Sequence, residues 1–170
     1  MKNKITCIGI LFLFIPVLLS ADLEPRHYEP LGNFSIIPPA GWNVTEYPGL
    51  KFHIFMGLNP DGFIPNLVFV DENFSGNMNA YIEANMQSLI FFVPDFVTLS
   101  RSSFITDSGI SGEQIHINNT QHGNFLRQIF YFFLIEDGRY LVITATVPEF
   151  AAEDYIPIFD ACIRTFEFIN

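Results

Sequence analysis

The chain has 170 residues, of which 49% are hydrophobic and 15% charged, and its formal net charge is −10 at pH 7. Because nucleic acids and anionic lipid surfaces are bound by clustered Lys and Arg side chains, this acidic balance excludes both as expected partners. The length suits one domain with a core of its own.

The first 21 residues have the pattern of a secretory signal peptide. A basic start at residues 1–4 is followed by an apolar run at 5–19, and small residues precede the polar stretch that begins at Asp22. The run of about 15 residues is shorter than the roughly 20 that a membrane span needs. We expect cleavage near Ala21, a periplasmic or secreted location and no stable membrane span. An uncleaved anchor is the alternative.

Residues 22–170 are expected to form a single domain that is held together by its core. Cys7 leaves with the signal peptide, so Cys162 has no intramolecular disulfide partner, although the compartment would allow one. Six basic and 18 acidic residues remain, a net charge of −12. The same segment contains 18 of the 20 Phe residues, which is ample material for an apolar core.

The first half of this domain predicts about four short strands and then a helix. After an extended lead-in at 22–31, strands are expected at 34–37, 42–47, 50–56 and 67–70, with Pro and Gly turns between them. Apolar residues then recur at helical spacing over 77–92, with Ser75 or Asn77 as the cap and Pro94 after the end. They are Met78, Ile82, Met86, Leu89 and Val93.

The second half predicts about four more strands and a closing helix. Strands are expected at 96–104, 112–117, 125–135 and 140–147, and Asp137-Gly138 between the last two is a strong hairpin signal. Apolar residues at 155–166 have clear helical spacing, and Pro157 places the helix start near Glu153. We therefore predict an α+β fold: a mostly antiparallel sheet with the two helices packed on one face.

The order of elements and an early Pro-Ala-Gly-Trp turn at 39–42 resemble the PsbP-like superfamily, the PsbP- and DcrB-like exported proteins. The matching residues are the strand and turn at 34–42 and the closing helix with its Arg164-Thr165-Phe166 ending. The resemblance covers nearly the whole of 22–170. It implies a PsbP-like fold and a non-catalytic binding or accessory role, and it transfers no functional residue.

No catalytic, cofactor-binding or metal-binding residue is expected, and we predict that the chain is not an enzyme. His116 and His122 are six residues apart across a predicted loop, but metal sites usually need three or four ligands. Ser111 lies in Gly-Ile-Ser-Gly, which lacks the nucleophile-elbow spacing. Acidic doublets at 71–72, 136–137 and 153–154 lack calcium-loop spacing and fit solvated turns and helix starts.

Three further features have a structural interpretation. Cys162 lies on the apolar side of the closing helix, where a buried, inert thiol is expected. Trp42 is expected to anchor the core beside the Gly41 turn. Asn-x-Ser/Thr patterns, which are glycosylation acceptors in a eukaryotic secretory pathway, begin at Asn33, Asn43, Asn73 and Asn118.

The excess of apolar residues on both faces of the strands suggests a surface that binds a partner or a ligand. The first hypothesis is an accessory domain that docks onto an envelope or secreted protein through the sheet face opposite the helices. The alternative is a carrier of an apolar small molecule in a cavity between the sheet and the helices.

Overall fold

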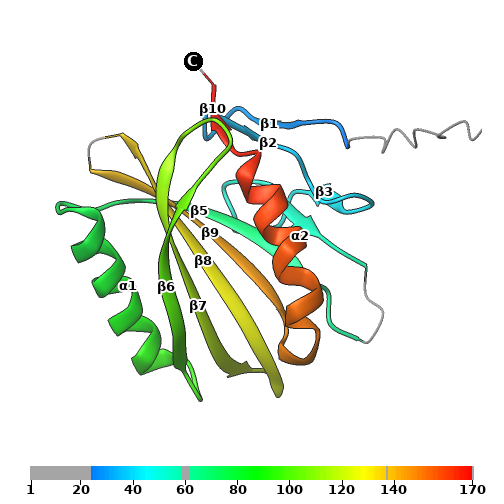
Figure 1. The fold of residues 1–170 in the computed structure, drawn as a ribbon, viewed down its shortest axis with the longest axis vertical. Helices are drawn as coiled ribbons and strands as arrows, with labels where there is room; N and C mark the ends of the chain where they lie inside the picture. Colours follow the sequence, from blue (N-terminus) through cyan, green and yellow to red (C-terminus); the bar gives the residue numbers. More distant parts are fainter. Residues whose placement is uncertain (1–23, 59–61, 137, 170) are drawn as a thin grey trace, which may run out of the picture.

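The computed structural model describes residues 24–58, 62–136 and 138–169 (Figure 1). The predicted signal peptide at 1–21 lies outside this range. The elements of the described residues, in chain order, are β1 (His27–Glu29), β2 (Phe34–Ile36), β3 (Asn43–Thr45), β4 (Ile54–Met56), β5 (Asn66–Asn73), α1 (Met78–Phe92), β6 (Val97–Ile105), β7 (Ser111–Gln121), β8 (Asn124–Glu136), β9 (Arg139–Pro148), the 3-10 turn η1 (Glu149–Ala151), α2 (Ala152–Arg164) and β10 (Glu167–Phe168).

The strands form two sheets. The larger has seven strands in the order β3-β4-β5-β9-β8-β7-β6, and the smaller has the order β1-β2-β10. All pairings between the described strands are antiparallel, so the predicted α+β class with a mostly antiparallel sheet is confirmed. The predicted hairpin is present as β8 and β9, with Glu136 opposite Arg139.

The two helices cover opposite faces of the large sheet, so the prediction that both pack on one face is wrong (Figure 1). Phe130 and Phe132 of β8 share a cluster with Tyr81 and Ile82 of α1. The residues that alternate with them, among them Tyr131, share a second cluster with α2 and the small sheet. The physical reason lies in β8 itself: a strand that is apolar on both sides needs cover on both sides.

Helix α1 follows its predicted pattern. The Asn77 side chain accepts a hydrogen bond from the Ala80 N–H at 2.9 Å, which caps the start. Tyr81 and Ile82 are buried against the sheet, and Met78, Met86 and Leu89 pack at the edge of the same cluster. The helix connects β5 to the edge strand β6 and therefore crosses the sheet on this face.

Helix α2 begins at Ala152, directly after η1, one residue before the predicted start. Pro157 lies inside it, where its missing N–H costs one hydrogen bond of the helix. Cys162 is buried on the sheet-facing side, as predicted, and burial raises the pKa of its thiol. Trp42 packs against this cluster beside Phe159.

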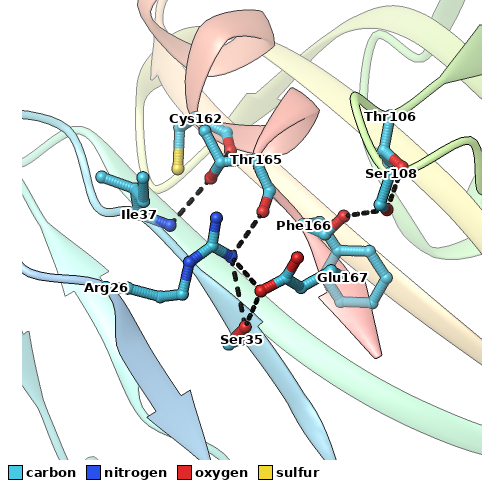
Figure 2. A network of polar contacts seen from close by, with 9 residues as sticks. All are labelled: Arg26, Ser35, Ile37, Thr106, Ser108, Cys162, Thr165, Phe166 and Glu167. Carbon is cyan, nitrogen blue, oxygen red and sulfur yellow. Dashed lines mark hydrogen bonds and ion pairs between the residues drawn. The ribbon is translucent and has the colours of Figure 1, made fainter. Parts of the chain in front are cut away.

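The small sheet was not predicted as a sheet of its own. Its strand β2 was expected at 34–37, but strands as short as β1 and β10 carry no periodic signal. Strand β2 pairs with β1 on one side and with β10 on the other. Figure 2 shows the polar network that joins them to the end of α2. Arg26 donates to the Thr165 carbonyl at 2.8 Å and pairs with Glu167 at 3.0 Å, while Thr165 accepts from the Ile37 N–H at 2.8 Å.

The network extends to the turn between β6 and β7. The Ser108 hydroxyl donates to the Phe166 carbonyl at 3.0 Å and lies 2.9 Å from the Thr106 hydroxyl (Figure 2). The C-terminal segment is therefore fixed from two sides. Among the described helices, none has the length and apolar character that a membrane crossing requires.

Candidate functional site

Two histidines and a glutamate converge where the small sheet meets the start of β4. His27 and Glu29 are two apart on β1, so their side chains lie on the same side of the strand. His53 directly precedes β4. The Glu29 Oε2 atom lies 2.8 Å from His53 Nδ1 and 3.6 Å from His27 Nε2. The described parts of the chain contain one group of three potential metal ligands, and it is this one.

The glutamate of this cluster is buried, ionised and held by hydrogen bonds. Its side chain is only 2% exposed. Burial alone would raise the pKa of Glu29, but hydrogen bonds from the His53 ring, the His53 N–H and the Leu31 N–H outweigh burial and lower it. A carboxylate is therefore kept in the interior, and the side chains nearest to its charge in the described chain are two imidazoles.

One of these imidazoles has an unsatisfied nitrogen. His27 Nε2 is buried and makes no hydrogen bond, while the His27 ring packs edge-on against Phe55 and His53. Burial lowers the pKa of His27, and the neighbouring Glu29 offsets this only in part. The ring is thus neutral at pH 7, with a nitrogen that lacks a partner among the described residues.

Sequence reasoning missed this cluster, since it assigned no metal ligand and weighed only His116 and His122. His116 lies on β7 opposite Ile129, and His122 lies in the turn before β8. Neither belongs to a group of three potential ligands within the described residues. The available signal was His-x-Glu at 27–29, because alternate residues of a strand share a face. Nothing local linked that pair to His53.

The acidic doublets have structural roles. Asp71 pairs with Lys51 at 2.7 Å and with Arg139. Glu72 accepts a hydrogen bond from the Tyr81 hydroxyl at 2.6 Å. Glu153 and Asp154 lie in the first turn of α2, where they complement the helix dipole.

Two other sequence features fall at turns or on the surface. Gly109 has φ +86° in the turn before β7, and Ser111 is the first residue of that strand. The side chains that begin three of the four glycosylation patterns are exposed: Asn33, Asn43 and Asn73.

The most exposed large apolar side chains of the described residues lie at the C-terminal end of α1. Phe91 and Phe92 are 84% and 85% exposed, and Ile90 beside them is also exposed. We call these three residues the aromatic end of α1.

The sequence had also suggested that Phe55, Val68, Phe130 and Phe132 could be left on a free sheet face. Phe130 and Phe132 are buried beneath α1, Phe55 is buried in the cluster on the other face, and Val68 is partly buried. Because one helix lies on each face of the large sheet, no face lies opposite both helices, and that docking surface is a wrong prediction.

An apolar groove lies between the predicted Pro-Pro-Ala turn and α2. Its volume is about 500 Å³. It is lined by Ile37, Pro38, Pro39, Ala40, Trp42, Pro157, Ile158, Ala161, Cys162 and Thr165. A second hollow of about 410 Å³ lies between α1 and the sheet, and its lining mixes apolar side chains with polar ones such as Gln128, Thr144 and Thr146.

Comparison with solved structures identifies the architecture. The cyanobacterial PsbP protein CyanoP from Synechocystis sp. PCC 6803 matches with a TM-score of 0.63 and 12% identity, over 98% of each chain. The fold is PsbP-like. LpqN of Mycobacterium tuberculosis, described as involved in cell envelope biogenesis, matches with a TM-score of 0.61 and 12% identity, over 81% of this chain and 83% of LpqN.

A third solved structure with a similar fold is that of a protein described as of unknown function. PA94 of Pseudomonas aeruginosa, described as a putative regulator, has a TM-score of 0.53 and 14% identity, over 73% of this chain and 94% of PA94. No family model matches the sequence, and no curated protein does. At these identities the PsbP-like likeness defines the fold alone, and the resemblance seen in the sequence is confirmed at that level.

Proposed function

We propose that this chain is an exported, non-catalytic accessory domain that binds a protein partner through the aromatic end of α1. The observation that carries the proposal is the exposure of Phe91 and Phe92, 84% and 85%. Adjacent apolar side chains left in water usually mark an interaction site. Aromatic residues, Phe among them, are also enriched at protein interfaces, where a few residues carry most of the binding energy.

The charge around this site favours a protein over a membrane surface. Helix α1 has no basic residue in its last turn, and its sequence contains Glu83 as the only charged residue. Helices that lie on membranes usually carry Lys and Arg beside their apolar face to attract anionic lipids. A partner with an apolar recess and a neutral or basic rim complements this surface.

The export part of the proposal rests on the leader at 1–21. A similar fold in LpqN, which is described as involved in cell envelope biogenesis, supports an extracytoplasmic role. The test is the intact mass of the protein recovered from the producing cell and its location. A mature chain that begins near Asp22 outside the cytoplasm is expected, and a full-length cytosolic chain would contradict export.

Site-specific photo-crosslinking tests the docking surface. A photoreactive phenylalanine analogue at position 91 or 92 is expected to give one discrete adduct when the protein is irradiated in its own compartment. Phe150, which is 74% exposed at another place on the surface, provides a matched control position. The same adducts from all three positions, no adduct, or an adduct with twice the chain's mass would each overturn the proposal, the last by indicating self-association.

Removing the Phe91 and Phe92 rings should then weaken binding of the protein that was crosslinked. Phe91→Ser with Phe92→Ser is expected to lower affinity for the crosslinked partner by at least about 30-fold, since hot-spot residues contribute about 2 kcal/mol or more. Phe150→Ser should leave that affinity unchanged. An unchanged affinity in the double variant would show that the crosslink reports proximity and not binding.

The apolar groove beside α2 supports the second candidate, a carrier of an apolar small molecule. Trp42 lines this groove and is the chain's single tryptophan, so its fluorescence reports on occupancy. A carrier is expected to hold a lipid in native mass spectrometry, and a brominated fatty acid should then quench Trp42. If the fatty acid quenches Trp42 but native mass spectrometry finds no lipid bound to the purified protein, the protein-docking proposal is favoured.

A further inference from the structure

The His27, Glu29 and His53 cluster contains the donor set of a transition-metal site. Two imidazole nitrogens and one carboxylate suit zinc and its first-row neighbours, whereas calcium and magnesium prefer oxygen ligands alone. The three ligand atoms lie within 4.8 Å of one another. This inference is independent of the partner-binding role proposed for α1.

Two of the three separations between ligand atoms are close to those around one shared ion, and the third is no more than 4.8 Å. Two atoms bound tetrahedrally to zinc at about 2.0–2.1 Å are about 3.3 Å apart. The measured separations from Glu29 Oε2 are 2.8 Å to His53 Nδ1 and 3.6 Å to His27 Nε2. Shifts of about half an ångström would bring both pairs to the tetrahedral value.

The unsatisfied nitrogen of His27 is the second, independent observation. Buried polar atoms almost always have a partner, and one that lacks it calls for an explanation. His27 Nε2 is buried without a hydrogen bond, 3.6 Å from a carboxylate oxygen. A cation between them would satisfy the nitrogen lone pair and the carboxylate at once.

The buried negative charge points the same way. Lys and Arg side chains pair with other carboxylates of the described chain, and none pairs with Glu29. His53 contacts Glu29 by hydrogen bonds, and His27 Nε2 makes none in the described chain. A divalent ion would supply the positive charge that no Lys or Arg side chain provides. His53 would then carry its ring proton on Nε2, since Nδ1 would be a ligand.

We propose that His27, Glu29 and His53 together bind one divalent first-row transition-metal ion, with zinc as the probe. The ion would join β1 of the small sheet to the segment before β4 of the large sheet. Three protein ligands leave one tetrahedral position open. His53 is 32% exposed, so solvent has access to this end of the cluster.

Isothermal titration of the metal-free, EDTA-treated protein with zinc tests the proposal. One zinc ion per chain is expected, with a rise in melting temperature, because a ligand that binds only the folded state stabilises it. Cobalt in place of zinc should give the visible absorption of a tetrahedral nitrogen and oxygen site. No zinc binding by the folded mature protein would overturn the proposal.

The decisive variant is His27→Phe. His27 Nε2 makes no hydrogen bond, and a phenyl ring keeps the packing against Phe55, so the metal-free variant should fold normally. Zinc affinity should fall at least about tenfold, the loss seen when even outer-shell partners of metal ligands are removed. Glu29→Gln and His53→Gln should weaken zinc binding similarly, with circular dichroism to verify folding.

His122→Asn is the matched control. It removes a histidine outside the cluster, and Asn tolerates the positive φ of 49° at this position. This variant should bind zinc as the parent does. Loss of zinc in His122→Asn, or full binding by folded His27→Phe, would place the metal elsewhere and contradict the assignment.

Discussion

The Tyr131 hydroxyl donates a hydrogen bond of 2.7 Å to Asp160, and this contact joins the central strand β8 to α2. Tyr131 is fully buried. The same carboxylate oxygen accepts a second hydrogen bond of 2.7 Å from Gln114 of β7. Burial and the adjacent Asp160 charge raise the pKa of Tyr131, so its hydroxyl remains a donor over the range in which the protein folds.

Tyr131→Phe should therefore lower the free energy of unfolding by about 1–3 kcal/mol, because it removes one donor from a half-buried carboxylate and leaves the ring in place. Urea denaturation measures the change. Tyr155→Phe is the control, since the Tyr155 hydroxyl makes no side-chain hydrogen bond in the described chain, and it should change stability by less than about 0.5 kcal/mol. Equal losses in both variants would contradict a specific role for the contact with Asp160.

The lowered pKa of Asp71 means that the folded protein should lose stability in acid. Burial would raise the pKa of Asp71, but hydrogen bonds from Lys51 and Arg139 outweigh it and hold the pKa below the ordinary value of 3.8. A lowered carboxyl pKa stabilises the fold above the unfolded value, and the contribution is lost as pH falls through the folded value. Asp71→Asn should flatten the fall in stability as the pH drops below the ordinary value of 3.8.

The control for this pH profile is Asp95→Asn. Asp95 makes no ion pair with the described residues, and Asn accepts its positive φ of 54°. The acid limb of its stability curve should match that of the parent. An Asp71→Asn curve that runs parallel to the parent at lower stability would mean that the ion pairs do not set the acid dependence.

The two sides of α1 should respond differently to mutation. Ile82 is buried against the sheet, and Ile82→Ala is expected to cost about 2–5 kcal/mol through lost burial and a cavity. Phe91→Ser with Phe92→Ser changes exposed residues of the same helix and should cost less than about 1 kcal/mol. Thermal denaturation compares them, and a large loss in the double variant would show that these rings support the fold.

Gly112 marks a close approach between β7 and β8. A Cβ atom at this position would lie 2.7 Å from Cδ1 of Phe133 and would also overlap the Phe132 carbonyl oxygen. Gly112→Ala is therefore expected to cost about 1–3 kcal/mol by overpacking. Ser111→Ala, at the exposed neighbouring position, should be neutral in the same urea titration. A neutral Gly112→Ala would show that the two strands separate easily.

Much of the fold was predictable because its signals are local. Met78, Ile82 and Leu89 recur at the spacing of one helical face, and Asn77 supplies the cap that the structure shows. Asp137-Gly138 predicted the hairpin in which Glu136 faces Arg139. These patterns depend on neighbours within about four residues, so they do not require knowledge of the chain path.

The arrangement of these elements depended on contacts between distant segments. The apolar residues on both sides of β8 predicted burial on both sides, but only the packed structure placed α1 over Phe132 and α2 over Tyr131. In the same way, the His-x-Glu pattern on β1 placed two potential metal ligands on one face of the strand. His53 lies beside them only because the start of β4 packs against the small sheet. Local spacing determines periodicity and turns, and the path of the whole chain determines which faces and side chains come together.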